Sequence, residues 1–278
     1  MSTTVFKSKN SCNTLLAIQN QMMSCLGNSY QADKTTTINT KRNVIPEIGP
    51  VELGGVLPRV RYFGIGIKGF ANITSDNNIS QPYQPSAEEF DLYEPIPFRC
   101  VRTPLDTDVA DQYRMVTTTT VNGQKYYLYW LKKISFLTST VNLTKVDADG
   151  NETEYTVDAS ANLNPTPSDL FFTDLSQAST RVVASITGEC RITGSEVLEA
   201  INVLYGGDLR RARISEVGTY SGIEVGLGAD TVNEIPARTE AAYVQLCTHE
   251  CSLGNPVDKD DDLIVNHLVF QNGSCVLT

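Results

Sequence analysis

Five residues near the C-terminus bring together the side chains best suited to chemistry in this sequence. Cys247-Thr248-His249-Glu250-Cys251 holds two thiols and an imidazole, which are ligands that zinc prefers. If residues 241–249 form a strand, Cys247 and His249 point to the same face, because side chains alternate along a strand. A zinc site needs a fourth ligand, and no second C-x-x-C pair supplies one. We therefore expect a buried and a loop cysteine beside a polar histidine, and no metal.

A glycine pattern suggests a second kind of chemistry. Gly64-Ile65-Gly66-Ile67-Lys68-Gly69 matches the G-x-G-x-x-G string of dinucleotide-binding proteins. Their mechanism needs a helix that begins at these glycines, so that its N-terminal amides meet the pyrophosphate. Residues 70–78 have the composition of a loop or strand. We therefore predict a strand whose glycines let a backbone or an aromatic ring approach closely, and no cofactor.

Three clusters of charged residues are further candidates for binding sites, two for calcium and one for a partner. The carboxylates at residues 147–151 and 258–262 resemble calcium loops, but neither cluster has the glycine and glutamate spacing of a calcium hand. We predict a hairpin loop and a solvated turn. Arg210, Arg211 and Arg213 form the one dense basic cluster, and in a chain of net charge −10 it favours a protein partner over nucleic acid.

No pattern marks a catalytic nucleophile. The chain has no G-x-S-x-G string and only two histidines, His249 and His267. Counting residues does not exclude a serine or cysteine with a histidine base, but nothing singles one out. We therefore predict no catalytic, cofactor-binding or metal-binding residues, and we expect that the protein is not an enzyme.

Composition indicates a globular chain with an acidic body. Hydrophobic residues make up 41% and charged residues 19% of 278, so Thr, Ser, Asn and Gln must supply much of the polar surface. Residues 1–70 carry eight lysines and arginines against three carboxylates, so this part has a balance of +5 and the remainder −15. A basic arm on an acidic body is one route to self-assembly, and random scatter of charge is the alternative.

Helical signals occur at two places. Residues 11–28 carry apolar side chains at roughly helical spacing, followed by Gly27-Asn28 as a C-terminal turn. Residues 195–205 form a shorter candidate, with Thr193 and Glu196 spaced as in a capping box. Residues 31–58 lack any sustained period and indicate an extended arm.

Strand signals dominate from residue 59 onward. Asn122-Gly123 predicts a tight hairpin between residues 115–121 and 125–136. Further hairpins are expected around residues 147–151 and around Gln271-Asn272-Gly273. Tyr127 and Tyr129 lie on one face of the predicted strand, and Trp130 lies on the opposite face. Because both faces carry aromatic side chains, this strand is central in a sheet or covered by a partner.

These signals predict a mainly β fold, a β-sandwich or barrel-like body with an N-terminal helix and arm and one or two short helices. We expect residues 1–58 to form the helix and arm, and residues 59–278 to form the body, with a subdivision near residues 162–168, where Asn and Pro concentrate. The seven cysteines have irregular spacing and suggest buried thiols before a disulfide framework.

Localisation follows from the apolar runs. None has the length of a membrane helix, and the first residues lack the apolar core of a signal peptide. We expect a chain made in a cytoplasm, with no membrane partner and no specific nucleic-acid partner.

The helix and arm at residues 11–58, the segment Pro58-Arg59-Val60-Arg61-Tyr62-Phe63-Gly64-Ile65-Gly66 and the Thr- and Asn-rich hairpins together resemble the minor virion structural proteins of tailed bacteriophages, the baseplate, neck and collar class. The resemblance implies a virion location after assembly in the host cytoplasm. It also implies a homo-oligomer that binds other virion structural proteins, no catalysis, and no functional residues to transfer.

Three function classes therefore compete. A non-catalytic assembly subunit of a large particle is the first, and a carbohydrate- or surface-binding β module is the alternative. An enzyme of unrecognised type is the third, which a pocket with convergent acids would signal.

Overall fold

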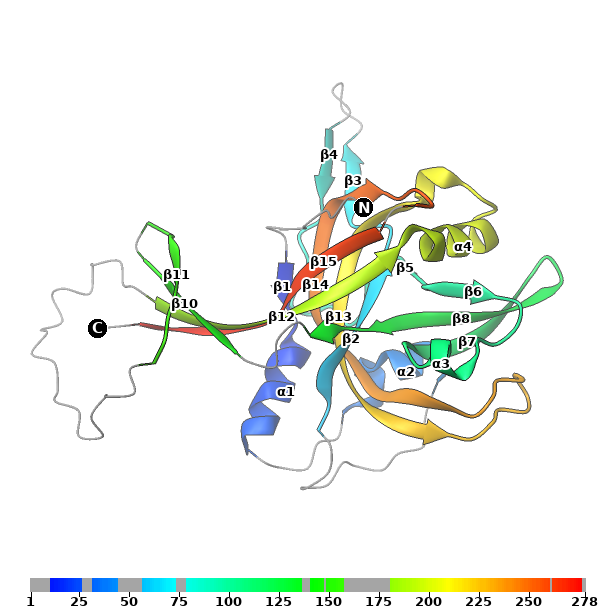
Figure 1. Cartoon of the computed structure of the whole chain (residues 1–278), viewed down its shortest axis with the longest axis horizontal. Helices are drawn as coiled ribbons and strands as arrows, with labels where there is room; N and C mark the ends of the chain where they lie inside the picture. Colours follow the sequence, from blue (N-terminus) through cyan, green and yellow to red (C-terminus); the bar gives the residue numbers. More distant parts are fainter. Residues whose placement is uncertain are drawn as a thin grey trace, which may run out of the picture. The chain divides into compact units, whose positions relative to one another are not determined.

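The computed structural model describes residues 11–26, 32–44, 57–73, 79–136, 141–147, 149–157, 181–260 and 262–276. Within these ranges the protein is mostly β with short helices (Figure 1), which confirms the predicted class. The strands are β1 (Ser11–Asn13), β2 (Arg59–Gly66), β3 (Phe70–Ile73), β4 (Ile79–Pro82), β5 (Pro95–Ile96), β6 (Arg99–Val101), β7 (Tyr113–Val121), β8 (Gln124–Lys133), β9 (Ser135–Phe136), β10 (Asn142–Val146), β11 (Glu152–Glu154), β12 (Arg181–Thr193), β13 (Arg213–Leu227), β14 (Arg238–Pro256) and β15 (Asp262–Val276). The helices are α1 (Leu15–Leu26), η1 (Lys34–Thr36), α2 (Ile38–Lys41), α3 (Thr107–Ala110), α4 (Gly194–Leu204) and η3 (Leu209–Arg211).

The chain divides into two compact units. The first comprises residues 1–134 and 190–265, and the second comprises residues 135–189 and 266–278. In the first, a sheet runs in the order β1-β14-β13-β2-β8-β6, with β5 paired to β2, β7 paired to β8, and β3-β4 as a separate ladder. In the second, the order is β11-β10-β12-β15, with β9 paired to β12. The predicted division at residue 58 is therefore not the division of the structure, and the predicted boundary near 162–168 lies outside the described residues.

The N-terminal helix is present but does not belong to a separate arm. β1 pairs antiparallel with β14, from Ser11 opposite Glu250 to Asn13 opposite Thr248. Thr14 then caps α1: its hydroxyl accepts from the N–H of Ala17 and donates to a carbonyl of β14. These contacts join the helix to the sheet of the first unit.

The expected arm also contributes to the body through residues 32–44. Asn39 is buried, its amide donates 2.8 Å to the Ala241 carbonyl, and its side-chain oxygen accepts 2.8 Å from the Val244 N–H. One side chain thus satisfies the backbone of β14 in the way that a neighbouring strand would. A contact made by a single side chain leaves no periodic pattern, which is why the sequence predicted an extended linker here.

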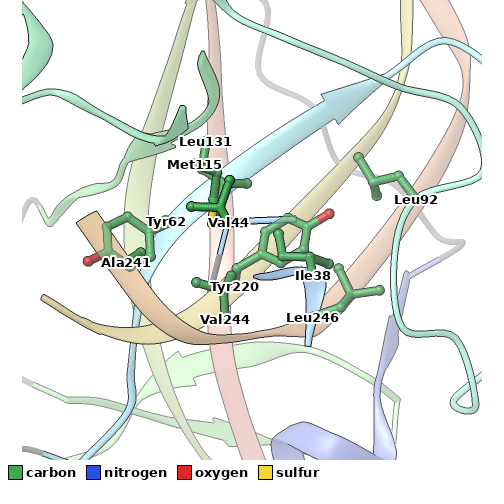
Figure 2. Close-up of a cluster of buried hydrophobic side chains, with 10 residues drawn as sticks. All are labelled: Ile38, Val44, Tyr62, Leu92, Met115, Leu131, Tyr220, Ala241, Val244 and Leu246. Carbon is green, nitrogen blue, oxygen red and sulfur yellow. The ribbon is translucent and has the colours of Figure 1, made fainter. Parts of the chain in front are cut away.

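The core of the first unit gathers side chains from distant parts of the chain (Figure 2). Residues 214–223 of β13 are all buried, so this central strand is covered on both faces. The cluster around it consists of Ile38, Val44, Tyr62, Leu92, Met115, Leu131, Tyr220, Ala241, Val244 and Leu246.

A buried carboxylate bridges β14 and β7, which are not paired in the sheet. Glu240 accepts from the N–H groups of Met115 and Val116, at 2.5 and 3.1 Å. Met115 has a φ of 62°, in the left-handed region. This breaks the alternation of a strand and lets two successive N–H groups meet one carboxylate.

Two of the three predicted hairpins are confirmed. β7 and β8 meet at Asn122-Gly123, where both residues have positive φ, and β10 and β11 flank the loop that begins at Asp147. The third hairpin is wrong: β15 runs without a break through Gln271-Asn272-Gly273 and lies next to β12.

The predicted short helix is confirmed as α4. Thr193 accepts from the N–H of Glu196, and the Glu196 carboxylate accepts from the N–H of Thr193, which completes the capping box.

Candidate functional site

The cysteine and histidine motif lies on β14, but the structure brings only part of it together. Cys247 is the extra residue of a β-bulge, because the pairing with β13 passes directly from Thr248 to Leu246. Its buried thiol contacts a backbone carbonyl, 3.6 Å away. His249 and Cys251 lie two residues apart on one face, with 3.5 Å between Nε2 and Sγ. The predicted shared face of Cys247 and His249 is therefore broken by the bulge.

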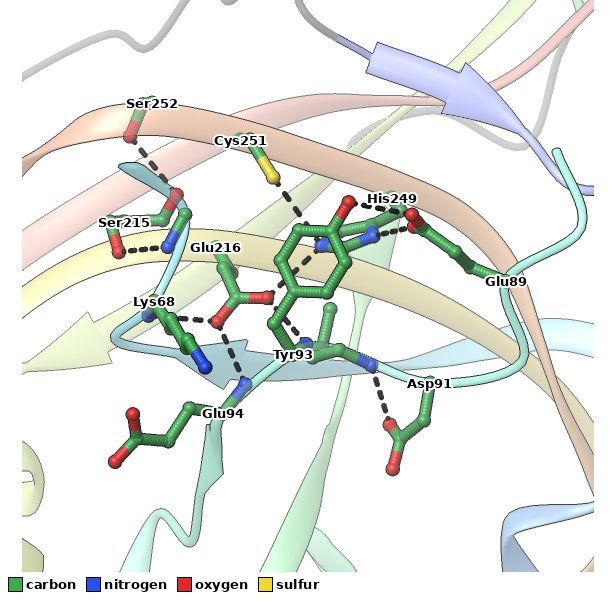
Figure 3. A network of polar contacts seen from close by, with 12 residues as sticks. Lys68, Glu89, Asp91, Tyr93, Glu94, Ser215, Glu216, His249, Cys251 and Ser252 are labelled. Atoms are coloured by element: carbon green, nitrogen blue, oxygen red, sulfur yellow. Dashed lines mark hydrogen bonds and ion pairs between the residues drawn. The ribbon is translucent and has the colours of Figure 1, made fainter. Parts of the chain in front are cut away.

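Glu216 of β13 completes a buried group with His249 and Cys251 (Figure 3). Their candidate ligand atoms lie within 4.8 Å of one another. The Glu216 carboxylate accepts hydrogen bonds from the backbone N–H groups of Lys68 at 2.9 Å, Tyr93 at 2.7 Å and Glu94 at 3.2 Å. This one carboxylate therefore ties the end of β2 and the segment before β5 to the central strand.

His249 lies between two carboxylates. Its Nδ1 is 2.5 Å from Glu89 Oε2, and its Nε2 is 3.2 Å from Glu216 Oε1. Burial lowers the pKa of His249, but the hydrogen bonds to Cys251, Glu216 and Glu89 outweigh burial and raise this pKa to about 10. The imidazole is therefore a cation at neutral pH and balances the buried charge of Glu216.

Glu89 is held in turn by its own neighbours. Its Oε1 accepts from the N–H of Ser86 at 3.0 Å and from the hydroxyl of Tyr93 at 2.6 Å. The Tyr93 ring packs edge-on against the imidazole of His249, with 4.8 Å between ring centroids. Burial and the hydrogen bond to Glu89 raise the pKa of the Tyr93 hydroxyl, so it remains a donor.

Two kinds of chemistry could use this arrangement. A thiol beside an imidazole that contacts a carboxylate is the order of a cysteine nucleophile with its base. However, Cys251 is 1% exposed and His249 is 0% exposed, so a substrate has no access to either. A metal would have to displace the backbone N–H groups that already bind Glu216. The geometry supports a buried ionic cross-link between the loop at residues 85–96 and the sheet.

Almost the whole chain matches one family model. This model, described as a family of unknown function (DUF7208), matches residues 1–269. The chain belongs to DUF7208. Comparison with curated proteins and with solved structures gave no match. The DUF7208 match includes residues of both units, and it includes Glu89, Glu216, His249 and Cys251. No helix in the described part of the chain is long and apolar enough to cross a bilayer.

The glycine pattern of this DUF7208 chain has the predicted role in packing. A Cβ on Gly64 would lie 3.0 Å from the ring of Tyr220, and a Cβ on Gly69 would lie 2.0 Å from the Ser215 carbonyl oxygen. Gly66 likewise leaves room for the Glu216 carboxylate, which a Cβ would approach to 2.5 Å. These glycines allow close approach of a ring, a backbone and a carboxylate.

The other charged clusters are used within the chain. Asp147 accepts from the N–H groups of Asp149 and Asn151 in its own hairpin loop. Arg210 pairs with Asp208 at 2.8 Å, and its side chain is 90% exposed.

The aromatic strand is partly covered. Trp130 donates 2.8 Å to the Thr117 hydroxyl, and the Arg42 guanidinium lies 3.5 Å from the centroid of its ring. Arg42 therefore covers one face of this ring.

Sequence reasoning missed Glu89 and Glu216. Glu216 had no distinguishing signal, because β13 also carries Arg213, Ser215, Thr219, Ser221 and a second carboxylate, Glu224. Glu89 had none, since it lies in a polar segment that the tertiary fold brings to His249.

Proposed function

We propose that this chain is a non-catalytic subunit of a larger protein assembly and that it binds its neighbours through α1. The supporting observation is the outer face of this helix. Leu15, Ile18 and Met22 are 52%, 49% and 59% exposed, and their spacing of three and four residues places them on one face. α1 contains no charged residue, so this face can meet another protein without desolvating a charge.

The size of this face indicates what kind of assembly it serves. Burying the exposed half of each side chain contributes about 1 kcal/mol, so the three together contribute roughly 3 kcal/mol. That is too little for a stable isolated dimer, which needs an interface of about 1,000 Å² or more. In a particle with many copies of the chain the same contact is made many times, and multivalency raises the total affinity.

The buried ionic cross-link is consistent with a non-catalytic role. His249, Glu216 and Cys251 are closed to solvent and hold a loop against the sheet. A subunit that must keep its shape under the strain of assembly benefits from such a cross-link.

We further propose, from the resemblance stated above, that the particle is the virion of a tailed phage and that the partners are further copies and other virion structural proteins. Peptide mass spectrometry of purified particles tests this point. Absence of the protein from the particles would refute it. The alternative, a carbohydrate-binding module, has less support, because Arg42 covers one face of Trp130.

Sedimentation equilibrium tests the role of α1. Up to about millimolar concentration, where a contact of a few kcal/mol becomes populated, the wild-type chain should form weak oligomers that increase with concentration, and Ile18→Asp should remove them. Val232→Asp is the matched control, since Val232 is 86% exposed in the loop between β13 and β14. Circular dichroism checks that both variants fold. Equal association of both variants, or a wild-type chain that stays monomeric even at about millimolar concentration, would contradict the proposal.

A further inference from the structure

A cavity of about 470 Å³ lies in the first unit, away from the buried cross-link. It is bounded by the end of α2, the middle of β7, the loop between β13 and β14, and the start of β14. Two arginines line it, Arg42 and Arg238, together with apolar side chains that include Val44, Val116 and Ile235. Val44 also belongs to the core cluster (Figure 2), so this wall of the cavity is firmly packed.

Arg42 is a buried cation with unused hydrogen-bond donors. Its side chain is only 10% exposed, and its buried Nε has no hydrogen-bond partner among the described residues. The nearest carboxylate oxygen, Oδ2 of Asp91, lies 3.6 Å from Nη2, which is beyond a good hydrogen bond. That carboxylate is already engaged by Lys41 at 2.7 Å and by the hydroxyl of Tyr220 at 2.7 Å. Stacking on Trp130 therefore fixes the orientation of the Arg42 guanidinium without satisfying its donors.

Arg238 is also only partly satisfied. Its side chain is 14% exposed, and its Nε donates 3.1 Å to Glu240 Oε2. Glu240 at the same time accepts from the backbone of β7, which fixes the position of its carboxylate. The terminal nitrogens of Arg238 make no hydrogen bond to the described residues. Asp230, the carboxylate that lines the cavity, accepts instead from Val232 and Asn233 of its own loop.

We propose that this cavity binds a small organic oxyanion, a carboxylate or a phosphate ester that carries a short apolar group. A guanidinium fork matches the planar oxygens of such a group, and two partly satisfied guanidiniums held rigidly at one cavity are complementary to it. The lining is more polar than apolar, so its smaller apolar part receives only a short apolar group. The volume lies in the range of small-molecule sites. The proposal does not depend on assembly, because every group in it belongs to one chain.

Trp130 is the only tryptophan in the chain and stacks on Arg42, so its fluorescence reports on the site. The purified full-length protein should be titrated with acetate, hexanoate, inorganic phosphate and phenyl phosphate, each against sodium chloride of equal ionic strength. We expect a saturable change with hexanoate or phenyl phosphate, and weaker binding of acetate and inorganic phosphate, which lack the apolar group. The better of the two larger probes identifies the oxyanion.

Three variants test which residues bind. Arg238→Gln should weaken binding about tenfold to a hundredfold, and Arg42→Lys should weaken it while the charge remains, because the fork is lost. Arg210→Gln is the matched control, since Arg210 is exposed and, among the described residues, pairs with Asp208 alone. A shift of the melting temperature with the same probes gives a second measurement that does not depend on Trp130. No saturable change with any probe, or equal affinity of the Arg238 and Arg210 variants, would overturn the proposal.

Discussion

Replacing Glu216 with glutamine tests whether the buried cross-link stabilises the fold. The change keeps the size of the side chain but removes its charge and one acceptor. Lys68 and Glu94 donate to one oxygen, and Tyr93 and His249 lie at the other. Whichever way the new amide turns, its NH₂ group faces at least one backbone N–H that then has no acceptor.

The expected cost follows from these contacts. The backbone N–H group that loses its acceptor costs about 1–3 kcal/mol, and of its two carboxylate partners His249 keeps only Glu89. Such a loss is a large part of the stability of a typical domain. Urea unfolding followed by the fluorescence of Trp130 should therefore show a clearly lower midpoint for Glu216→Gln.

The dependence on pH gives a second test of the same contact. The folded pKa of His249, about 10, lies above the unfolded value near 6.5. The stabilisation is therefore complete below about pH 6.5 and is lost as the pH rises towards about 10. At roughly 1.4 kcal/mol per pH unit, the wild type should lose about 3 kcal/mol between pH 6 and pH 9. Glu216→Gln should lose less, since one of the two carboxylates that raise the pKa of His249 is gone.

Glu234→Gln is the matched control, because Glu234 is 71% exposed and its carboxylate pairs with Lys125 alone in the described part of the chain. It should leave both the midpoint and its pH dependence unchanged. An unchanged midpoint for Glu216→Gln, or an equal pH dependence in wild type and variant, would refute the cross-link.

Three other expectations can be measured in the same way. Gly69→Ala should destabilise the fold by about 1–3 kcal/mol or more, because the new Cβ would lie 2.0 Å from the Ser215 carbonyl oxygen. Gly226→Ala is its control and should leave the stability unchanged, because a Cβ at Gly226 would lie in open space. Thr193→Ala should cost about 1 kcal/mol in urea unfolding, since it removes the cap of α4, and no loss would contradict the capping box. EDTA should leave the melting temperature unchanged, because backbone N–H groups already bind the Glu216 oxygens. Stoichiometric zinc in the purified protein would contradict this expectation.

Features that depend on neighbours in the sequence were the ones that could be predicted. The cap of α4 joins residues three apart, and the turn between β7 and β8 needs only Asn122-Gly123. The same local reasoning was wrong at Gln271-Asn272-Gly273, where β15 continues beside β12. A turn signal is a preference of about 1 kcal/mol or less, which the pairing of a long strand outweighs.

The sequence by itself therefore determined the β-rich class, the N-terminal helix, α4 and the packing role of the glycines. Only the tertiary structure decided that Asn39 belongs to the body and that Glu89 meets His249, across 160 positions of the chain. It also decided that Arg42 and Arg238 share one cavity. The physical reason is that each of these contacts depends on strand order and register, and a bulge such as that at Cys247 redirects side chains that the alternating pattern places together.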